Sequence, residues 1–224
     1  MKDYRILIGA YGWQHAQWQG GFYPEDLPAE WQLAYYSNEF HVLLIPAAYW
    51  QQGPVDVAQW LKESSETLRF IVEWPTLWHT PQQIEQGDAL LAQFGDRLLG
   101  VVVPLRAQSA TALQPVIERL MRRYRLCLDY GVNTLSQDST QPSLLTHDHL
   151  SICWHGTGEA KQLQRGQLAL ARIDCKDLTL RGVRQALEAC LAAQDPQRYL
   201  VVIFEGEPPN VVMMEKATVM LDML

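Results

Sequence analysis

The segment RFIVEWPTLWHTPQQIEQGDALLAQFGDRLLGVVVP, residues 69–104, contains the unit on which the fold prediction rests. Its two ends, 69–73 and 98–103, are short runs of mainly apolar residues of the kind that form buried strands. Residues 81–94 between them have helical spacing and begin with proline, which is favoured in the first turn of a helix. The segment therefore predicts a strand, a helix and a second, parallel strand.

The same alternation continues in both directions. Six further strands are predicted at 4–9, 41–45, 125–129, 150–154, 168–173 and 199–205, although 168–173 is equally compatible with a helix. Further helices are predicted at 28–38, 54–66, 110–123, 178–193 and 210–223. Eight strands alternating with helices indicate an α/β protein with a TIM-like (β/α)8 barrel, slightly trimmed because such barrels typically have about 250 residues. An open doubly wound α/β sheet is the alternative, although no GxGxxG or P-loop motif follows a predicted strand.

Composition and charge narrow the class of protein. The 224 residues are 48% hydrophobic and 19% charged, and we expect one domain over residues 1–224 because no linker or fixed repeat is visible. The net charge is −7 and the longest basic run is Arg122-Arg123, which argues against a nucleic-acid partner. The N-terminus lacks a signal-peptide pattern and no apolar run reaches about 18 residues, so we expect a cytoplasmic protein without a membrane segment.

Cysteines and histidines do not predict a metal or a cofactor. The four cysteines are widely spaced without a CxxC pair, so neither a disulfide framework nor a zinc site is indicated. His147 and His149 form an HxH pair with no evident third ligand. We therefore expect no metal and no cofactor.

The first fifty residues carry a specific series of glycine, proline and aromatic positions. They are Gly9, Gly12-Trp13, Trp18-x-Gly20, Phe22-Tyr23-Pro24, Leu27-Pro28, Trp31, Tyr35-Tyr36, Phe40 and Tyr49-Trp50. In order and spacing this series resembles the YecE-like family, the domain of unknown function numbered seventy-two. Weaker similarities, such as His155-Gly156 after the sixth predicted strand, extend over the full length. The resemblance implies a TIM-barrel-like fold and a family without an established activity or cofactor.

The resemblance also implies polar residues at strand ends that this sequence lacks. Where the family has a Glu-x-Asn-Ser-Thr series on the second strand, these positions are Leu44, Pro46, Ala47 and Ala48. The family lysine of the third strand is Glu73, and the arginine before His-Gly is Cys153. The family glutamate of the fifth strand aligns with Asp129. An anionic ligand held by that lysine and arginine is therefore not expected here.

Barrel enzymes place their chemistry at the C-terminal ends of the strands. The predicted strand ends bring Glu73, Asp129 and His155 to one face, where an imidazole and two carboxylates can exchange protons, so we predict them as the catalytic set. We predict five ligand-binding residues around them: Tyr11, Trp13, Trp74, His79 and Trp154. Tyr130, Asp174, Glu205 and Glu207 lie at the same strand ends. The tryptophans could instead form a satellite core, and His155 could be a structural histidine.

Two functions from different classes follow. The first is a barrel that binds a small polar molecule at its C-terminal mouth, with turnover left open. The second is a barrel that has lost catalytic capacity and acts as a binding or protein-interaction scaffold, which the apolar residues at Leu44, Ala47, Ala48 and Cys153 favour.

Overall fold

The computed structural model describes residues 6–51, 55–105, 112–132, 149–193, 195 and 198–224. The strands are β1 (Ile6–Tyr11), β2 (Val42–Ile45), β3 (Arg69–Glu73), β4 (Leu98–Pro104), β5 (Leu126–Asp129), β6 (Ser151–Ile152), β7 (Ala169–Asp174) and β8 (Leu200–Glu205). The α-helices are α1 (Gln32–Glu39), α2 (Ala48–Gln51), α3 (Val57–Glu63), α4 (Pro81–Gln93), α5 (Gln114–Leu120), α6 (Leu180–Ala192) and α7 (Val211–Met223). Short 3₁₀ helices are η1 (Ala16–Trp18), η2 (Ala29–Trp31), η3 (Gly95–Arg97) and η5 (Ala160–Gln164).

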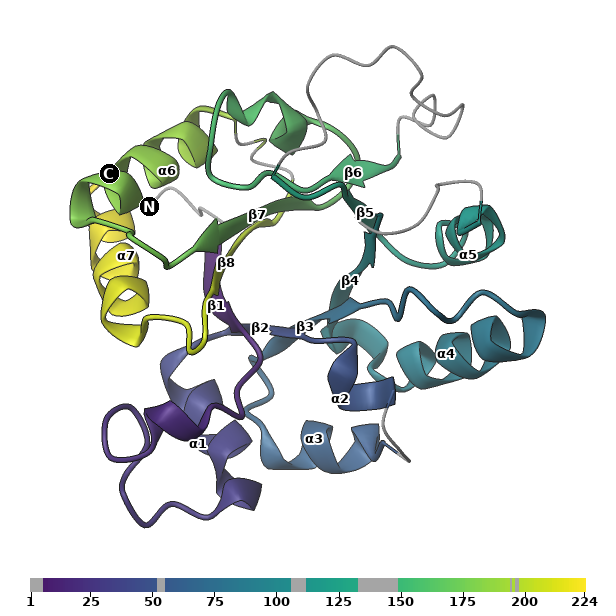
Figure 1. Ribbon diagram of the computed structural model, residues 1–224, viewed down its shortest axis with the longest axis horizontal. Helices are drawn as coiled ribbons and strands as arrows, with labels where there is room; N and C mark the ends of the chain where they lie inside the picture. Colours follow the sequence, from purple (N-terminus) through teal and green to yellow (C-terminus); the bar gives the residue numbers. More distant parts are fainter. Residues whose placement is uncertain (1–5, 52–54, 106–111, 133–148, 194, 196–197) are drawn as a thin grey trace.

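The eight strands form a ring of parallel neighbours with helices on its outside (Figure 1). Hydrogen-bonded pairing follows the order β6-β5-β4-β3-β2-β1-β8-β7. The two ends of this order meet where Trp154, two residues after β6, bridges Ala171 of β7. A doubly wound sheet reverses its strand order at a switch point, whereas this order is cyclic. The prediction of a (β/α)8 barrel is therefore confirmed, and the open-sheet alternative is wrong.

The predicted elements correspond closely to those of the structure, with differences at their ends. In the run 168–173, whose type was ambiguous, residues 169–173 lie in strand β7. The predicted helix 54–66 is shorter, because Asp56 caps α3 by accepting a hydrogen bond from the Gln59 backbone N–H at 2.9 Å. In the described part of the predicted helix 110–123, α5 begins only at Gln114 and has Pro115 in its first turn. Residues 110–111 and His147 lie outside the described residues.

The ring separates two apolar layers. The barrel interior contains an apolar cluster that includes Leu44, Ile71, Cys127, Leu170 and Ile203. A larger cluster fills the space between the strands and the surrounding helices. Because successive side chains of a strand point to opposite sides, alternate strand residues belong to the two layers. Among the described residues, no helix combines the length and apolar composition that a membrane span requires.

Part of the aromatic series of the first fifty residues packs as one cluster next to β1 and β2, whereas Trp31 is exposed and Trp50 packs on Trp74. Trp18, Phe22 and Tyr36 are in mutual ring contact, with centroids 5.2 to 6.4 Å apart. The Tyr36 hydroxyl accepts from the Ala10 N–H at 2.8 Å and donates to the Val42 carbonyl at 2.9 Å. These bonds tie β1 to β2, so the residues that carry the family resemblance have a structural role in the barrel.

Candidate functional site

The last inward-facing residues of four strands are polar. They are Glu73 on β3, Asp129 on β5, Arg172 on β7 and Glu205 on β8. Each follows an apolar interior residue by two positions, as Glu73 follows Ile71. Because positions i and i+2 of a strand face the same side, all four side chains enter the barrel at its C-terminal end. This end is where (β/α)8 barrels place their active sites.

Arg172 lies at the centre of this polar group and is only 4% exposed. Its Nη1 is 2.6 Å from Asp129 Oδ2, and its Nε donates to Glu205 Oε1. Its Nη2 is 3.5 Å from Glu73 Oε2, and the guanidinium lies 5.1 Å from the centre of the Tyr11 ring. A planar guanidinium with five N–H donors can serve several carboxylates at once. Arg172 therefore holds residues from three other strands in one network.

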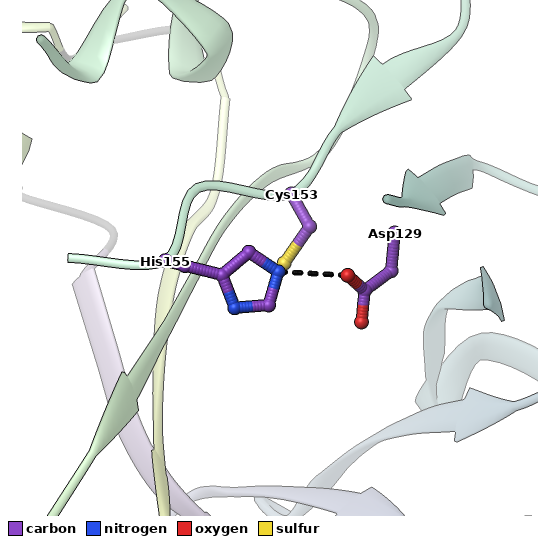
Figure 2. Close-up of side chains that lie close together, drawn as sticks. All are labelled: Asp129, Cys153 and His155. Carbon is purple, nitrogen blue, oxygen red and sulfur yellow. Dashed lines mark hydrogen bonds and ion pairs between the residues drawn. The ribbon is translucent and has the colours of Figure 1, made fainter. Parts of the chain in front are cut away.

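Asp129, which binds Arg172, also forms a close pair with His155. Figure 2 shows this pair. Asp129 is fully buried, and its Oδ1 lies 2.7 Å from His155 Nε2 and accepts the Gly131 N–H at 2.8 Å. Burial by itself lowers the pKa of His155, but the hydrogen bonds with Asp129 and Cys153 outweigh burial and raise this pKa to about 9. His155 is therefore an imidazolium at neutral pH, a proton donor held next to a carboxylate.

Glu73 is another carboxylate of the network. Burial raises the pKa of its carboxyl group, and the nearby Arg172 cation only partly opposes this effect. Tyr11 hydrogen-bonds to Glu73, and burial with the Glu73 charge raises the pKa of the Tyr11 hydroxyl. The buried Oε2 of Glu73 receives no hydrogen bond from any residue that the structure describes. Glu73 therefore has free acceptor capacity at the mouth.

Asp129, Cys153 and His155 could also be considered as metal ligands, since their ligand atoms all lie within 4.8 Å of one another (Figure 2). The contacts of Asp129 oppose this, because one oxygen already accepts from Gly131 and His155 and the other from Arg172. Burial and the neighbouring Cys127 raise the pKa of the Cys153 thiol well above its usual value, whereas a metal binds the thiolate. We interpret the three residues as a hydrogen-bonded group.

Three of the predicted ligand-binding residues are not brought to this network. Trp13, Trp74 and Trp154 are at most 3% exposed and belong to the layer between strands and helices. Trp74 directly follows Glu73, and Trp154 directly precedes His155. Because Glu73 and His155 face inward and successive side chains of a strand alternate, the rings of both tryptophans face outward. These three tryptophans therefore belong to the apolar core, which was the alternative to a ligand-binding role. The indole N–H groups of Trp74 and Trp154 each donate to a nearby backbone carbonyl at 2.9 Å.

His79 and the apolar family positions have other surroundings. His79 is exposed in the loop before Thr80, which caps α4. Leu44 is fully buried in the barrel interior next to Tyr11 of β1, and Ala48 is the exposed first residue of α2. Of the predicted site residues, the structure brings together Glu73, Asp129, His155 and Tyr11.

The central residue, Arg172, was not among the predicted site residues. The sequence did contain a signal for it, because Arg172 is the one charged residue in the otherwise apolar run 168–173. Buried charges are rare unless they are paired, so a charge inside a strand indicates partners from other strands. The ambiguity between strand and helix at 168–173 obscured this signal.

Comparison with known families matches residues 7–129, more than half of the chain, to the family described as "Protein of unknown function DUF72". The chain belongs to this family. This match confirms the family resemblance that the aromatic series indicated. The DUF72 family has no established activity. A search of curated proteins finds no match.

One solved structure of low sequence identity shares the fold of this DUF72 protein. A D-psicose 3-epimerase from Clostridium cellulolyticum H10, solved with D-tagatose, is 9% identical, covers 97% of both chains and has a TM-score of 0.51. An exo-β-1,4-mannosidase from Opitutaceae bacterium strain TAV5 has 14% identity and a TM-score of 0.47, over 88% of this chain and 51% of that one. At 9% identity the likeness to the epimerase is one of fold alone.

Proposed function

We propose that this protein binds a small polar molecule at the C-terminal mouth of the barrel. The observation that carries the proposal is the buried Arg172 network, which gathers Glu73, Asp129 and Glu205 from three strands at this mouth. Glu73 and Glu205 are 14% and 20% exposed, so the network is reached from solvent. Buried charge at a barrel mouth is costly to fold, and binding sites are where proteins retain such groups.

The charges of the network favour a neutral or cationic ligand. Three carboxylates face two cationic groups, Arg172 and His155, and both cations are already paired with Asp129. The Oε2 of Glu73 lies 3.5 Å from Arg172 Nη2 but accepts no hydrogen bond from a described residue, so it can accept one from a ligand. A polyhydroxylated molecule or an amine supplies such donors, whereas a carboxylate or phosphate ligand would be repelled. We therefore assign a polyol, sugar or amine as the ligand class.

Two of the groups are suited to proton transfer as well as to binding. The imidazolium of His155 can donate a proton, and the carboxyl group of Glu73, whose pKa is raised by burial, can accept or return one. Acid–base turnover of the bound molecule is thus the chemistry that the site supports. Product analysis after incubation with a bound ligand tests this second step separately from binding.

The binding step can be tested by thermal shift with sugars, including D-tagatose, polyols, amino acids and polyamines. A ligand at about 100 times its Kd adds about 2.7 kcal/mol of stability, or about 5 to 10 °C in Tm for a chain of this size. We expect such a shift in the wild type and in Glu188→Gln, which changes an exposed glutamate of α6. We expect the shift to be lost in Glu73→Gln.

Two results would contradict the proposal. A shift that persists in Glu73→Gln would place the ligand elsewhere on the protein. No shift with any compound of the panel would instead favour the second function, a barrel without catalytic capacity that acts as an interaction scaffold.

A further inference from the structure

A cavity of about 640 Å³ lies at the opposite, N-terminal end of the barrel. It is lined by the start of β4, by the end of α4 and by residues 121–125, which connect α5 to β5. Gln167, just before β7, completes the lining. Because the strands run away from this end, the cavity is distinct from the Arg172 network at the C-terminal mouth.

The lining is strongly basic. Arg122, Arg123 and Arg125 contribute three cationic side chains, and Asp96 is the one acidic residue among the lining residues that the structure describes. The side chains of Arg122 and Arg125 are exposed and form no ion pair within the described part of the chain. Two guanidinium groups therefore remain available to a ligand.

The third arginine is held in place by a buried carboxylate. Asp88 of α4 is 3% exposed and lies 2.9 Å from Arg123 Nη1, 2.8 Å from Arg119 Nη2 and 2.7 Å from the Tyr124 hydroxyl. Burial alone would raise the pKa of Asp88, but these hydrogen bonds lower it, so Asp88 stays ionised. This group fixes the wall from which Arg123 and Tyr124 line the cavity. Four arginines against Asp88 and Asp96 leave a local excess of positive charge.

From these observations we infer that the cavity binds a small phosphate-bearing molecule through Arg122, Arg123 and Arg125. The forked N–H donors of arginine match the oxygens of phosphate. The volume falls within the range of about 300 to 1,000 Å³ that is usual for small-molecule sites. Three arginines line this cavity in a chain of net charge −7, so a small ligand fits better than a long nucleic acid.

Isothermal titration with pyrophosphate tests the inference. The variant Arg122→Gln/Arg125→Gln removes the two unpaired arginines, and Arg181→Gln/Arg184→Gln removes the same charge from the exposed face of α6. We expect the first variant to bind pyrophosphate at least ten-fold more weakly than the wild type and the second to bind it equally well. Thermal unfolding of each variant confirms that it is folded.

Three outcomes would overturn the inference. The first is that pyrophosphate fails to bind to the wild type. The second is that both double variants lose affinity equally, which would mean that binding depends on net charge alone. The third is that a single-stranded oligonucleotide binds through the same arginines while pyrophosphate does not, which would identify a nucleic-acid surface. Glu73→Gln should leave pyrophosphate binding unchanged, so this inference and the proposed function fail independently.

Discussion

A buried cation among carboxylates is stable only while its partners remain, because each of these charges has left water. Arg172 is such a cation, and its guanidinium connects β7 to Glu73, Asp129 and Glu205. Its removal would leave three acidic groups close together, with only the His155 imidazolium to compensate their charge. The single side chain of Arg172 therefore controls the charge state of the whole mouth.

We expect Arg172→Met to lower the free energy of unfolding by about 3 to 5 kcal/mol, the usual cost of leaving buried charges unpaired. Urea denaturation at pH 7 measures this change. The matched variant Arg184→Met removes an exposed arginine that pairs with Glu188 at 2.8 Å and should change stability little. A loss in Arg172→Met as small as that in Arg184→Met would show that the network contributes little to the fold.

The raised pKa of His155 predicts a pH-dependent contribution to stability. Because the folded-state pKa of about 9 exceeds the unfolded value of about 6.5, this contribution is full below pH 6.5 and is lost as the pH rises to 9. The stability difference between wild type and His155→Gln should thus shrink over this range by up to about 3 kcal/mol. Urea denaturation at several pH values measures it. A constant difference would mean that folding does not favour the imidazolium.

At the scale of elements, the β3–α4 unit shows how local signals and packing combine. Thr80 and Gln83 form a capping box at the start of α4, and Pro81 occupies its first turn. Further along, Gly87 gives the helix room to approach Trp74, because a Cβ at Gly87 would lie 2.4 Å from the Trp74 ring. The cap is visible in the sequence, whereas the need for glycine at 87 arises from the contact with Trp74, the residue after β3.

Gly87→Ala should therefore destabilise the protein by about 1 to 3 kcal/mol through overpacking, although alanine favours helices. Gly182→Ala in α6 is the control, because its Cβ would meet its nearest neighbours at an ordinary 3.4 Å. This control should be neutral or stabilising by up to about 1 kcal/mol. Chemical denaturation of both variants tests the contrast. Equal effects of the two substitutions would contradict the role assigned to Gly87.

At the scale of the whole molecule, the barrel closes through a short seam. β6 has two residues, and beyond it the Trp154 N–H donates to the Leu170 carbonyl at 3.0 Å while the Arg172 N–H donates to the Trp154 carbonyl at 2.8 Å. By contrast, β7 and β8 are paired along six residues. Local opening is easiest where few hydrogen bonds hold two strands together.

Hydrogen exchange should accordingly be at least ten-fold faster at the Trp154 amide than at the amides of β8 under native conditions. Mass spectrometry or NMR on the native protein measures both. Similar rates at the seam and in β8 would mean that the barrel opens only as a unit, and would contradict a weak closure between β6 and β7.

The sequence by itself determined the order of strands and helices, because hydrophobic spacing, proline positions and caps are properties of neighbouring residues. It also placed Glu73, Asp129 and His155 at strand ends, and parallel strands carry such ends to one face. The family resemblance was also visible in the sequence. The aromatic residues that carry it lie within the first fifty residues and pack mainly against one another, so their spacing along the chain is enough to recognise them.

Only the tertiary structure decided which residue of each adjacent pair faces inward. In the pairs Glu73-Trp74 and Trp154-His155, alternation requires that one side chain point into the barrel, but it does not say which one. Ring closure made that choice and placed Arg172 against carboxylates from three other strands. Such contacts depend on which strands become neighbours and at what register, and this is decided when the whole sheet forms.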